Sequence, residues 1–278
     1  MLNQIMDAQI EDFQRHLIRQ EKSVNTVEKY LRDVQCFFSY AAERMIDKFL
    51  TMEYKAWLKE KYAISSANSM IAALNSFLRY TGHNECCVRQ FKVQRQVYCA
   101  EERELTKAEY IRLLEAAKKQ PQLELVLQTI CGTGIRVSEL RFITVEAAHK
   151  GEAIVTCKSK TRTVFIAREL KKKLLRYCRE RKIGSGEIFI TQGGKSLNRS
   201  NIWRQMKRLC CIAQVSPSKV FPHNLRKLFA RTFYGIDKDI SKLTDILGHS
   251  SINTTRIYIM TTGVEHQRKI ECLGLVVS

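Results

Sequence analysis

A succession of segments with helical periodicity limits the fold of this chain more than any other feature. In the first eighty residues, apolar side chains recur at helical spacing, as in Ile10, Phe13 and Leu17. Five small polar residues are candidate N-caps that divide this region into further helices: Ser23, Asn25, Thr51, Ser65 and Ser66. Gly82 is placed to end the last helix. We therefore predict a small helical bundle over residues 1–82.

A polar stretch without a repeating apolar face follows this bundle. Residues 83–103 include "RQFKVQRQVYCAEE", whose mixed charge is typical of a linker between domains. Folded structure resumes at Thr106, which forms a T-x-x-E capping box with Glu109 and predicts a helix to about Lys119. The second domain is therefore predicted to span residues 104–278.

One pair of strand-like segments interrupts the helices of the second domain. "AIVTC" and "RTVFI" are rich in β-branched residues, and the short polar "KSKT" between them predicts a hairpin. Helical periodicity returns over residues 168–182, 199–213, 223–234, 238–247 and 251–260. The expected fold class is mainly α with a small antiparallel β-sheet (α+β).

The charge balance indicates a polyanionic partner. The chain has 47 Lys and Arg against 28 Asp and Glu, a formal net charge of +19. Such an excess is expected of a protein that binds nucleic acid. No stretch approaches the roughly 20 apolar residues that span a bilayer, and the N-terminus has no apolar signal region. We expect a nucleic acid as partner and no membrane.

The cysteines do not form a metal or disulfide pattern. Ten are present, including two adjacent pairs, and none follows C-x-x-C spacing. We therefore expect reduced, mostly buried thiols in a cytoplasmic protein, and no metal site.

Several segments carry groups suited to phosphodiester chemistry without a metal. Displacement at phosphorus needs arginines to bind the oxygens, an acid to protonate the leaving alkoxide, and a nucleophile such as tyrosine. These groups occur in "GTGIRVSEL", "CKSKT", "HNLR", "LGHSS" and "TTRIY". Taken singly, each has an ordinary structural explanation, for example that Tyr258 is a core aromatic between Ile257 and Ile259.

Taken together, these motifs resemble those of the tyrosine recombinase or integrase family, which includes Xer-type recombinases and the integrases of phages and conjugative elements. The resemblance extends over essentially the whole chain and is strongest from Glu104 onward. Its most specific parts are "GTGIRVSEL", "HNLR" and "LGHSSINTTRIY". It implies a helical, SAM-like core-binding domain followed by a catalytic domain, which together close around duplex DNA.

The resemblance also implies a role for each matching residue. The implied catalytic residues are Arg136, Lys158, His223, Arg226, His249 and Tyr258. The two arginines would bind the scissile phosphate, with Glu139 buttressing Arg136. His223 would handle a proton, His249 would donate a hydrogen bond to the phosphate, and Tyr258 would be the nucleophile.

Two positions depart from the family pattern. Lys227 stands where a further histidine often follows the H-x-x-R box, and we interpret it as a structural difference. The hairpin turn is one residue shorter than usual, so that either Lys158 or Lys160 aligns with the family's lysine. We favour Lys158.

The implied reaction is site-specific recombination through a 3′-phosphotyrosyl intermediate, without a metal or nucleotide cofactor. A homo-tetramer on paired DNA sites would carry it out for integration or excision of a mobile element or for dimer resolution, with an accessory factor as an open question. The apolar tail with Leu273, Leu275, Val276 and Val277 would dock in cis or on a neighbouring subunit.

Two related functions remain as alternatives. A type IB topoisomerase uses similar residues, but the spacing from Gly248 and His249 to Tyr258 and the helical N-terminal domain favour a recombinase. A non-catalytic DNA-binding accessory protein is disfavoured because all six catalytic positions are filled. A metal-dependent nuclease would need clustered carboxylates, which these motifs lack.

Overall fold

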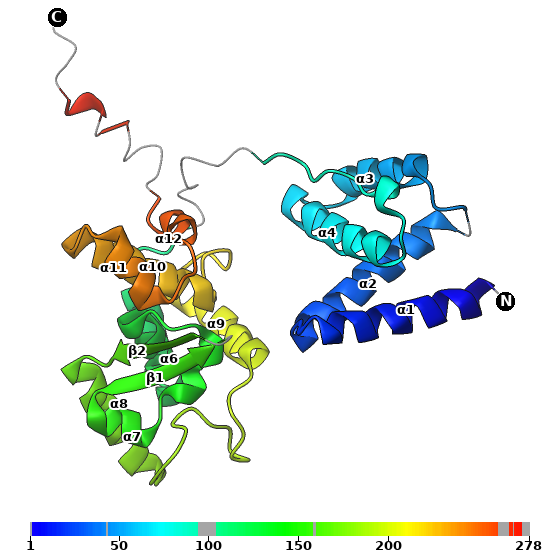
Figure 1. Ribbon diagram of the computed structural model, residues 1–278. Coiled ribbons are helices and arrows are strands. Elements are labelled where there is room, and N and C mark those ends of the chain that lie inside the picture. Colours follow the sequence, from blue (N-terminus) through cyan, green and yellow to red (C-terminus); the bar gives the residue numbers. More distant parts are fainter. Residues whose placement is uncertain are drawn as a thin grey trace, which may run out of the picture. The chain divides into compact units, whose positions relative to one another are not determined.

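The chain folds into two compact units, Met1–Arg95 and Gln96–Ser278. The computed structural model describes residues 2–42, 44–93, 104–157, 160–260, 267–268 and 270–273 (Figure 1). Helices dominate both units, and the described strands form one two-stranded sheet. The predicted α+β class is confirmed. Within the described residues, no helix combines the length and apolar character needed to cross a membrane.

The described part of the first unit is a bundle of four helices built around aromatic side chains. The helices are α1 (Leu2–Arg19), α2 (Val24–Ala41), α3 (Lys48–Lys61) and α4 (Ile64–Tyr80). Phe13 and Leu17 of the predicted face of α1 are fully buried. Phe77 of α4 meets Phe13 and Phe38 edge to face, with ring centroids 5.3 and 5.4 Å apart. Apolar burial therefore accounts for most of this unit's packing.

Two of the predicted helix starts in this unit are wrong. Helix α3 begins earlier, because the side chain of Asp47 accepts a hydrogen bond from the Leu50 N–H. Thr51 lies inside α3, where its hydroxyl donates to the carbonyl of Cys86 at 2.8 Å. Helix α4 begins at Ile64, so Ser65 and Ser66 are internal to it. Gly82, with φ +84°, follows the end of α4 as expected.

The segment after α4 packs on the first unit. A short 3₁₀ helix, η1 (Asn84–Cys86), leads into an extended stretch in which Val88 is buried. The Asn75 side chain hydrogen-bonds both the N–H and the carbonyl of Val88, at 3.0 and 2.8 Å. The beginning of the predicted linker is therefore attached to the bundle, and residues 94–103 of that linker lie outside the described residues.

The second unit contains most of the remaining elements. They are α5 (Lys107–Ala117), α6 (Pro121–Thr133), η3 (Val137–Phe142), α7 (Val145–Lys150), β1 (Glu152–Cys157), β2 (Lys160–Phe165), α8 (Arg168–Arg181), α9 (Arg199–Ala213), α10 (Pro222–Ile236), α11 (Ile240–Leu247) and α12 (Ile252–Tyr258). The Thr106–Glu109 capping box opens α5 as predicted. The predicted hairpin is also present, antiparallel, with Val155 opposite Arg162.

Helix α6 lies at the centre of this unit and places the site. It contacts α5, α8, α9 and α10, and its Leu127 and Ile130 are fully buried. Helices α10, α11 and α12 gather at one end of the unit and α7 and α8 at the other (Figure 1). Strand β2 contacts α11. The C-terminal end of α6, the hairpin and the last helices therefore converge.

Candidate active site

The turn after α6 brings the chain close to α10. Gly134 ends α6 with φ +66°, and a Cβ at this position would collide with the ring of Phe229. Glycine is therefore required both by the left-handed backbone and by the close approach of α10. Two residues later, Arg136 precedes η3.

Arg136 is held by Glu139, one turn further on. Its Nη1 donates to Glu139 Oε1 at 2.8 Å, and its backbone N–H donates to Glu139 Oε2 at 2.8 Å. Its Nη2 donates to the carbonyl of Gly248 at 3.2 Å. The Arg136 side chain is 35% exposed, so part of its guanidinium remains open to a ligand.

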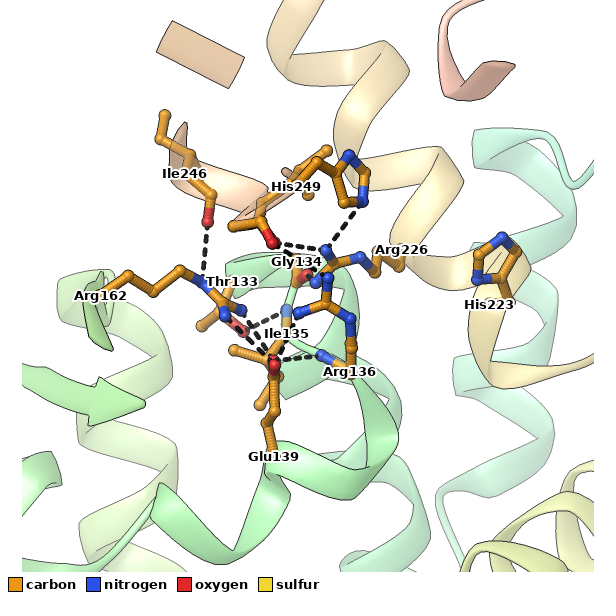
Figure 2. A network of polar contacts seen from close by, with 12 residues as sticks. Thr133, Gly134, Ile135, Arg136, Glu139, Arg162, His223, Arg226, Ile246 and His249 are labelled. Carbon is orange, nitrogen blue, oxygen red and sulfur yellow. Dashed lines mark hydrogen bonds and ion pairs between the residues drawn. The ribbon is translucent and has the colours of Figure 1, made fainter. Parts of the chain in front are cut away.

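Glu139 is a buried carboxylate shared by two arginines (Figure 2). Arg162, on β2, donates to both of its oxygens, at 3.1 and 2.7 Å. Burial alone would raise the pKa of Glu139, but the hydrogen bonds from Arg162 and Arg136 outweigh it and lower the pKa to about 2. Glu139 is therefore ionised at neutral pH and neutralises part of the positive charge around it.

Arg226, on α10, is the largest fully buried side chain of the described residues, at 2% exposed. Its Nη1 donates to the carbonyl of Gly134, and its Nη2 donates to the carbonyl of Leu247 at 2.5 Å. Burial, and then the charge of Arg136, lower the pKa of Arg226 to about 10, which leaves it charged at neutral pH. One guanidinium thus joins the α6 turn to the end of α11.

His249 lies against Arg226 in the turn between α11 and α12. Its Nε2 is 3.2 Å from Arg226 Nη2, and its Nδ1 is 2.9 Å from Thr255 Oγ1. Because arginine only donates, Nε2 accepts from Arg226 and Nδ1 carries the proton of the neutral ring. Burial and the charges of Arg226 and Arg136 lower the pKa of His249 to about 4. His249 is therefore neutral at pH 7.

Tyr258 ends α12 with its hydroxyl near His223. The hydroxyl lies 3.5 Å from His223 Nδ1, the outer limit of a hydrogen bond, and the Tyr258 side chain is buried. The Tyr258 ring centroid lies 4.9 Å from that of His223 and 4.8 Å from that of His249. Burial, followed by the charges of Lys227 and Arg226, lowers the pKa of His223. A neutral imidazole therefore faces the tyrosine hydroxyl.

The structure brings five of the six predicted site residues into one cluster: Arg136, His223, Arg226, His249 and Tyr258. Lys158 lies outside the described residues, as does the side chain of the alternative, Lys160. Lys227 pairs with Glu104 at 3.4 Å, which fits its interpretation as a structural difference.

The sequence interpretation missed Arg162 and Thr255. Arg162 precedes the buried Val164 by two residues, which places both on the same side of β2, so strand alternation was an available signal. Thr255 is fully buried between His249 and Thr244, whose hydroxyl is 2.8 Å away. No local pattern marks that contact.

Metal ligands are not grouped at this site. Over the part of the chain that the structure describes, no three His, Cys, Asp or Glu side chains stand close enough together to hold a metal ion. The polar groups of the cluster are instead arginine donors, two neutral imidazoles and a phenol, which suit an anionic ligand.

The second unit is mainly helical, with a small hairpin and this cluster of arginine, histidine and tyrosine. This is the architecture of a tyrosine recombinase catalytic domain. Residues 103–263 match the phage integrase family, and residues 10–84 match the N-terminal SAM-like domain of phage integrases. Because the first match covers more than half of the chain, the protein belongs to the phage integrase family. It is a tyrosine recombinase, an enzyme of the class that cleaves and rejoins DNA.

Curated relatives and solved structures match this chain over most of its length. Tyrosine recombinase XerA of Pyrococcus furiosus is 28% identical, with 96% of this chain and 94% of the relative covered. XerD of Vibrio cholerae is 27% identical over 84% of this chain and 85% of the relative. A λ integrase dimer bound to a COC′ core site gives a TM-score of 0.73 at 18% identity, covering 92% of this chain and 96% of that one. XerH bound to its difH substrate gives a TM-score of 0.67 at 21% identity, covering 95% of this chain and 84% of that one.

Proposed function

We propose that this protein is a site-specific recombinase in which Tyr258 attacks a DNA phosphate. The new bond joins the Tyr258 oxygen to phosphorus, the bond from phosphorus to the 5′-oxygen breaks, and a 3′-phosphotyrosyl intermediate results. Attack by the 5′-hydroxyl of a partner strand reverses these bonds and completes recombination. The observation that carries the proposal is the Tyr258 hydroxyl beside His223, with Arg226 and His249 in the same cluster.

Arg136 and Arg226 are proposed to bind the non-bridging oxygens of the scissile phosphate. Planar guanidinium groups bind two oxygens at once, and donors fixed before the reaction stabilise charge that develops in the transition state. Arg136 is partly exposed, and Arg226 Nε has no hydrogen-bond partner among the described residues. A buried, unpartnered donor on a charged side chain is well suited to an anion.

The two histidines are proposed to act differently. His223, neutral and next to the hydroxyl, accepts the proton of Tyr258, whose ordinary pKa of about 10 makes the phenol a poor nucleophile at pH 7. For His249 to donate to the phosphate, its Nε2 has to exchange the hydrogen bond from Arg226 for a proton of its own. A bound phosphate favours that change, because its negative charge offsets the two arginines that lower the pKa of His249.

Protonation of the departing 5′-oxygen is assigned to Lys158, with Lys160 as the alternative; this assignment rests on the motif alone. Either lysine would be carried on the β1–β2 hairpin.

The partners are proposed from charge and from the related structures. A net charge of +19 favours double-stranded DNA, with the two domains, residues 1–82 and 104–278, on either side of the linker binding it together. A λ integrase tetramer bound to a Holliday junction resembles this chain with a TM-score of 0.72, which supports a homo-tetramer on paired sites. Several finer points stay predictions. They are the biological role, either mobile-element integration or excision or dimer resolution, the need for an accessory factor, the cytoplasmic location and the docking of the C-terminal tail.

The test is a nicked DNA substrate whose short 5′ fragment diffuses away after cleavage. Wild type should accumulate protein joined to a DNA 3′ end, and peptide mapping should place the adduct on Tyr258. Tyr258→Phe removes one oxygen and should abolish the adduct while leaving DNA affinity unchanged. Tyr234→Phe, in the same small apolar cluster, is the matched control and should cleave like wild type. An adduct on another residue, or cleavage by Tyr258→Phe, refutes the assignment.

A further inference from the structure

Arg162 contacts two separate parts of the candidate site, Glu139 and the turn after α11, but does not belong to the predicted catalytic set. It lies on β2, and its side chain is only 14% exposed. Both of its Nη atoms donate to Glu139, and its Nε donates to the carbonyl of Ile246 at 3.1 Å (Figure 2). Every N–H-bearing atom of the guanidinium is therefore already engaged within the protein.

Glu139 links Arg162 to Arg136. The Glu139 carboxylate holds Arg136 by both its backbone N–H and its Nη1, as described above. Arg162 donates one hydrogen bond to each oxygen of the same carboxylate, and two such bonds restrict the plane of the carboxylate as well as its position. Without Arg162, the hydrogen bonds that the described residues give this carboxylate would come from Arg136 alone, and the carboxylate could move together with Arg136.

Arg162 also supports the turn that carries His249. Its Nε holds the Ile246 carbonyl, and its side chain lies directly over Gly248. A Cβ at Gly248 would come within 2.8 Å of Arg162 Cδ, so the turn and the guanidinium are in close contact. The Gly248 carbonyl in turn accepts from Arg136 Nη2. Hairpin, turn and phosphate-binding arginine are thus joined through one side chain.

We propose that Arg162 is a positioning residue for the cleavage step, which holds Arg136 through Glu139 in the orientation that receives the scissile phosphate. The inference rests on the proposed function of the site. Arg162 touches no reacting atom, and its effect is transmitted by the buried carboxylate. The carboxylate charge also matters, because Glu139 is the buried anion facing Arg136, Arg162 and Arg226.

An ordinary buried ion pair would contribute only to folding. The experiment therefore has to separate a role of Arg162 in folding from its role in positioning Arg136. Arg162→Gln should lower the single-turnover cleavage rate on the nicked substrate on the order of 10²-fold, the effect of misplacing a reacting group by about 1 Å. DNA affinity should stay within a few-fold of wild type. Arg162→Lys keeps the charge but cannot bind both carboxylate oxygens as a planar guanidinium does. Its cleavage rate should lie between those of wild type and Arg162→Gln.

The pH profile provides the readout that a purely structural role would not change. In Arg162→Gln, burial still raises the pKa of Glu139 while its strongest opposing hydrogen bonds are gone. The carboxyl should then be protonated at a higher pH than in wild type, so the cleavage rate of the variant should fall earlier as the pH is lowered. His223 and His249 also titrate, and the charge of Arg162 helps to lower the pKa of His249, so part of the difference between the two profiles comes from that histidine. The part that disappears in a Glu139→Gln background reports Glu139.

A double-mutant cycle tests transmission through the carboxylate. In a Glu139→Gln background, Arg162→Gln should lower the cleavage rate little further. It should add no new acid limb to the pH profile of cleavage. Arg176→Gln is the matched control, because this arginine pairs with Glu180 at 3.8 Å on the exposed surface of α8. It should cleave like wild type.

Wild-type cleavage by Arg162→Gln, or losses that add fully to those of Glu139→Gln, would overturn the inference. If Arg162→Gln does not fold, the same comparisons are made with Arg162→Lys, and an unchanged rate or an unshifted acid limb there overturns it. If wild type itself forms no adduct, the proposed function fails, which is a distinguishable result.

Discussion

Two apolar clusters of the second unit differ in size and in how they hold the chain. The large cluster extends from Leu105 to Leu228 and takes side chains from α5 to α10. Among the described residues, the small cluster contains four buried ones: Ala230, Leu243, Leu247 and Tyr258. The proposed nucleophile is one of those four. The segment that carries it is therefore supported by much less apolar burial than the rest of the unit.

Polar contacts supply the rest of the support for this segment. Arg226 binds the Leu247 carbonyl, Arg162 binds that of Ile246, and Arg136 binds that of Gly248. A hydrogen bond from a charged group contributes about 1.5–3 kcal/mol net, which is similar to the contribution of a fully buried leucine. The arginines proposed to bind phosphate thus also hold the segment with His249 and Tyr258, so its stability and its chemistry depend on the same groups.

Two matched leucines test this difference most strongly. Leu127 of the large cluster and Leu243 of the small one are both fully buried. Leu127→Ala should lower the free energy of unfolding by about 2–5 kcal/mol, because a cavity opens in a well-packed core. Cleavage per folded molecule should stay near wild type. Denaturant unfolding and single-turnover cleavage measure the two effects.

Leu243→Ala should show the reverse pattern. The small cluster can open locally, so hydrogen exchange of α11 and α12 should rise while global unfolding changes by less than about 2 kcal/mol. Cleavage should fall by more than it does in Leu127→Ala. Equal effects of the two substitutions on global stability and on cleavage would show that the clusters form one cooperative unit.

Two glycines provide a smaller test of the contact between the small cluster and the hairpin. Gly248 has φ +63° and lies under Arg162, whereas Gly151 has φ +85° and open space around it. Gly151→Ala should cost only the left-handed backbone strain, about 1–2 kcal/mol in the free energy of unfolding, with cleavage unchanged.

Gly248→Ala adds a collision with Arg162 to the same strain, so it should lower both the unfolding free energy and the cleavage rate. Thermal unfolding and cleavage of the two variants measure the difference. Equal cleavage by both would mean that Arg162 moves aside without consequence for the site.

The dependence of stability on pH tests the surroundings of His249. The pKa of His249 is lowered from 6.5 to about 4, so its protonation favours the unfolded chain. Stability should be fully present above pH 6.5 and lost as the pH falls toward 4, with His223 acting in the same direction. The pKa of Glu139, lowered from 4.5 to about 2, adds its loss only below pH 4.5.

His249→Gln should therefore reduce the slope of unfolding free energy against pH between 6.5 and 4.5, by at most about one proton. Glu139→Gln should leave that window nearly unchanged and flatten the profile below pH 4.5. Denaturant unfolding at a series of pH values measures both. An unchanged slope in His249→Gln would contradict the burial of a neutral imidazole beside two arginines.

Elements specified by neighbouring residues were predictable. The capping box of Thr106 and Glu109 uses a side chain and a backbone group three residues apart, and it is present as expected. Thr51 failed as a cap because Asp47 caps the helix first, which leaves Thr51 inside α3, where its hydroxyl donates to the distant carbonyl of Cys86. The short α7 was not predicted, because six residues are too few to show a helical period.

The sequence by itself determined the family, the helical bundle with its hairpin, and the motif residues, because these depend on residue types at short, regular spacing. Only the tertiary structure decided which groups share the buried Glu139 carboxylate and that His249 is neutral beside Arg226. Arg136 and Arg162 are far in sequence from the turn after α11, yet each donates one hydrogen bond to it, Arg136 to the Gly248 carbonyl and Arg162 to the Ile246 carbonyl. Such contacts depend on how α6, β2 and α11 pack, since a side chain's partner is set by the position of its helix or strand.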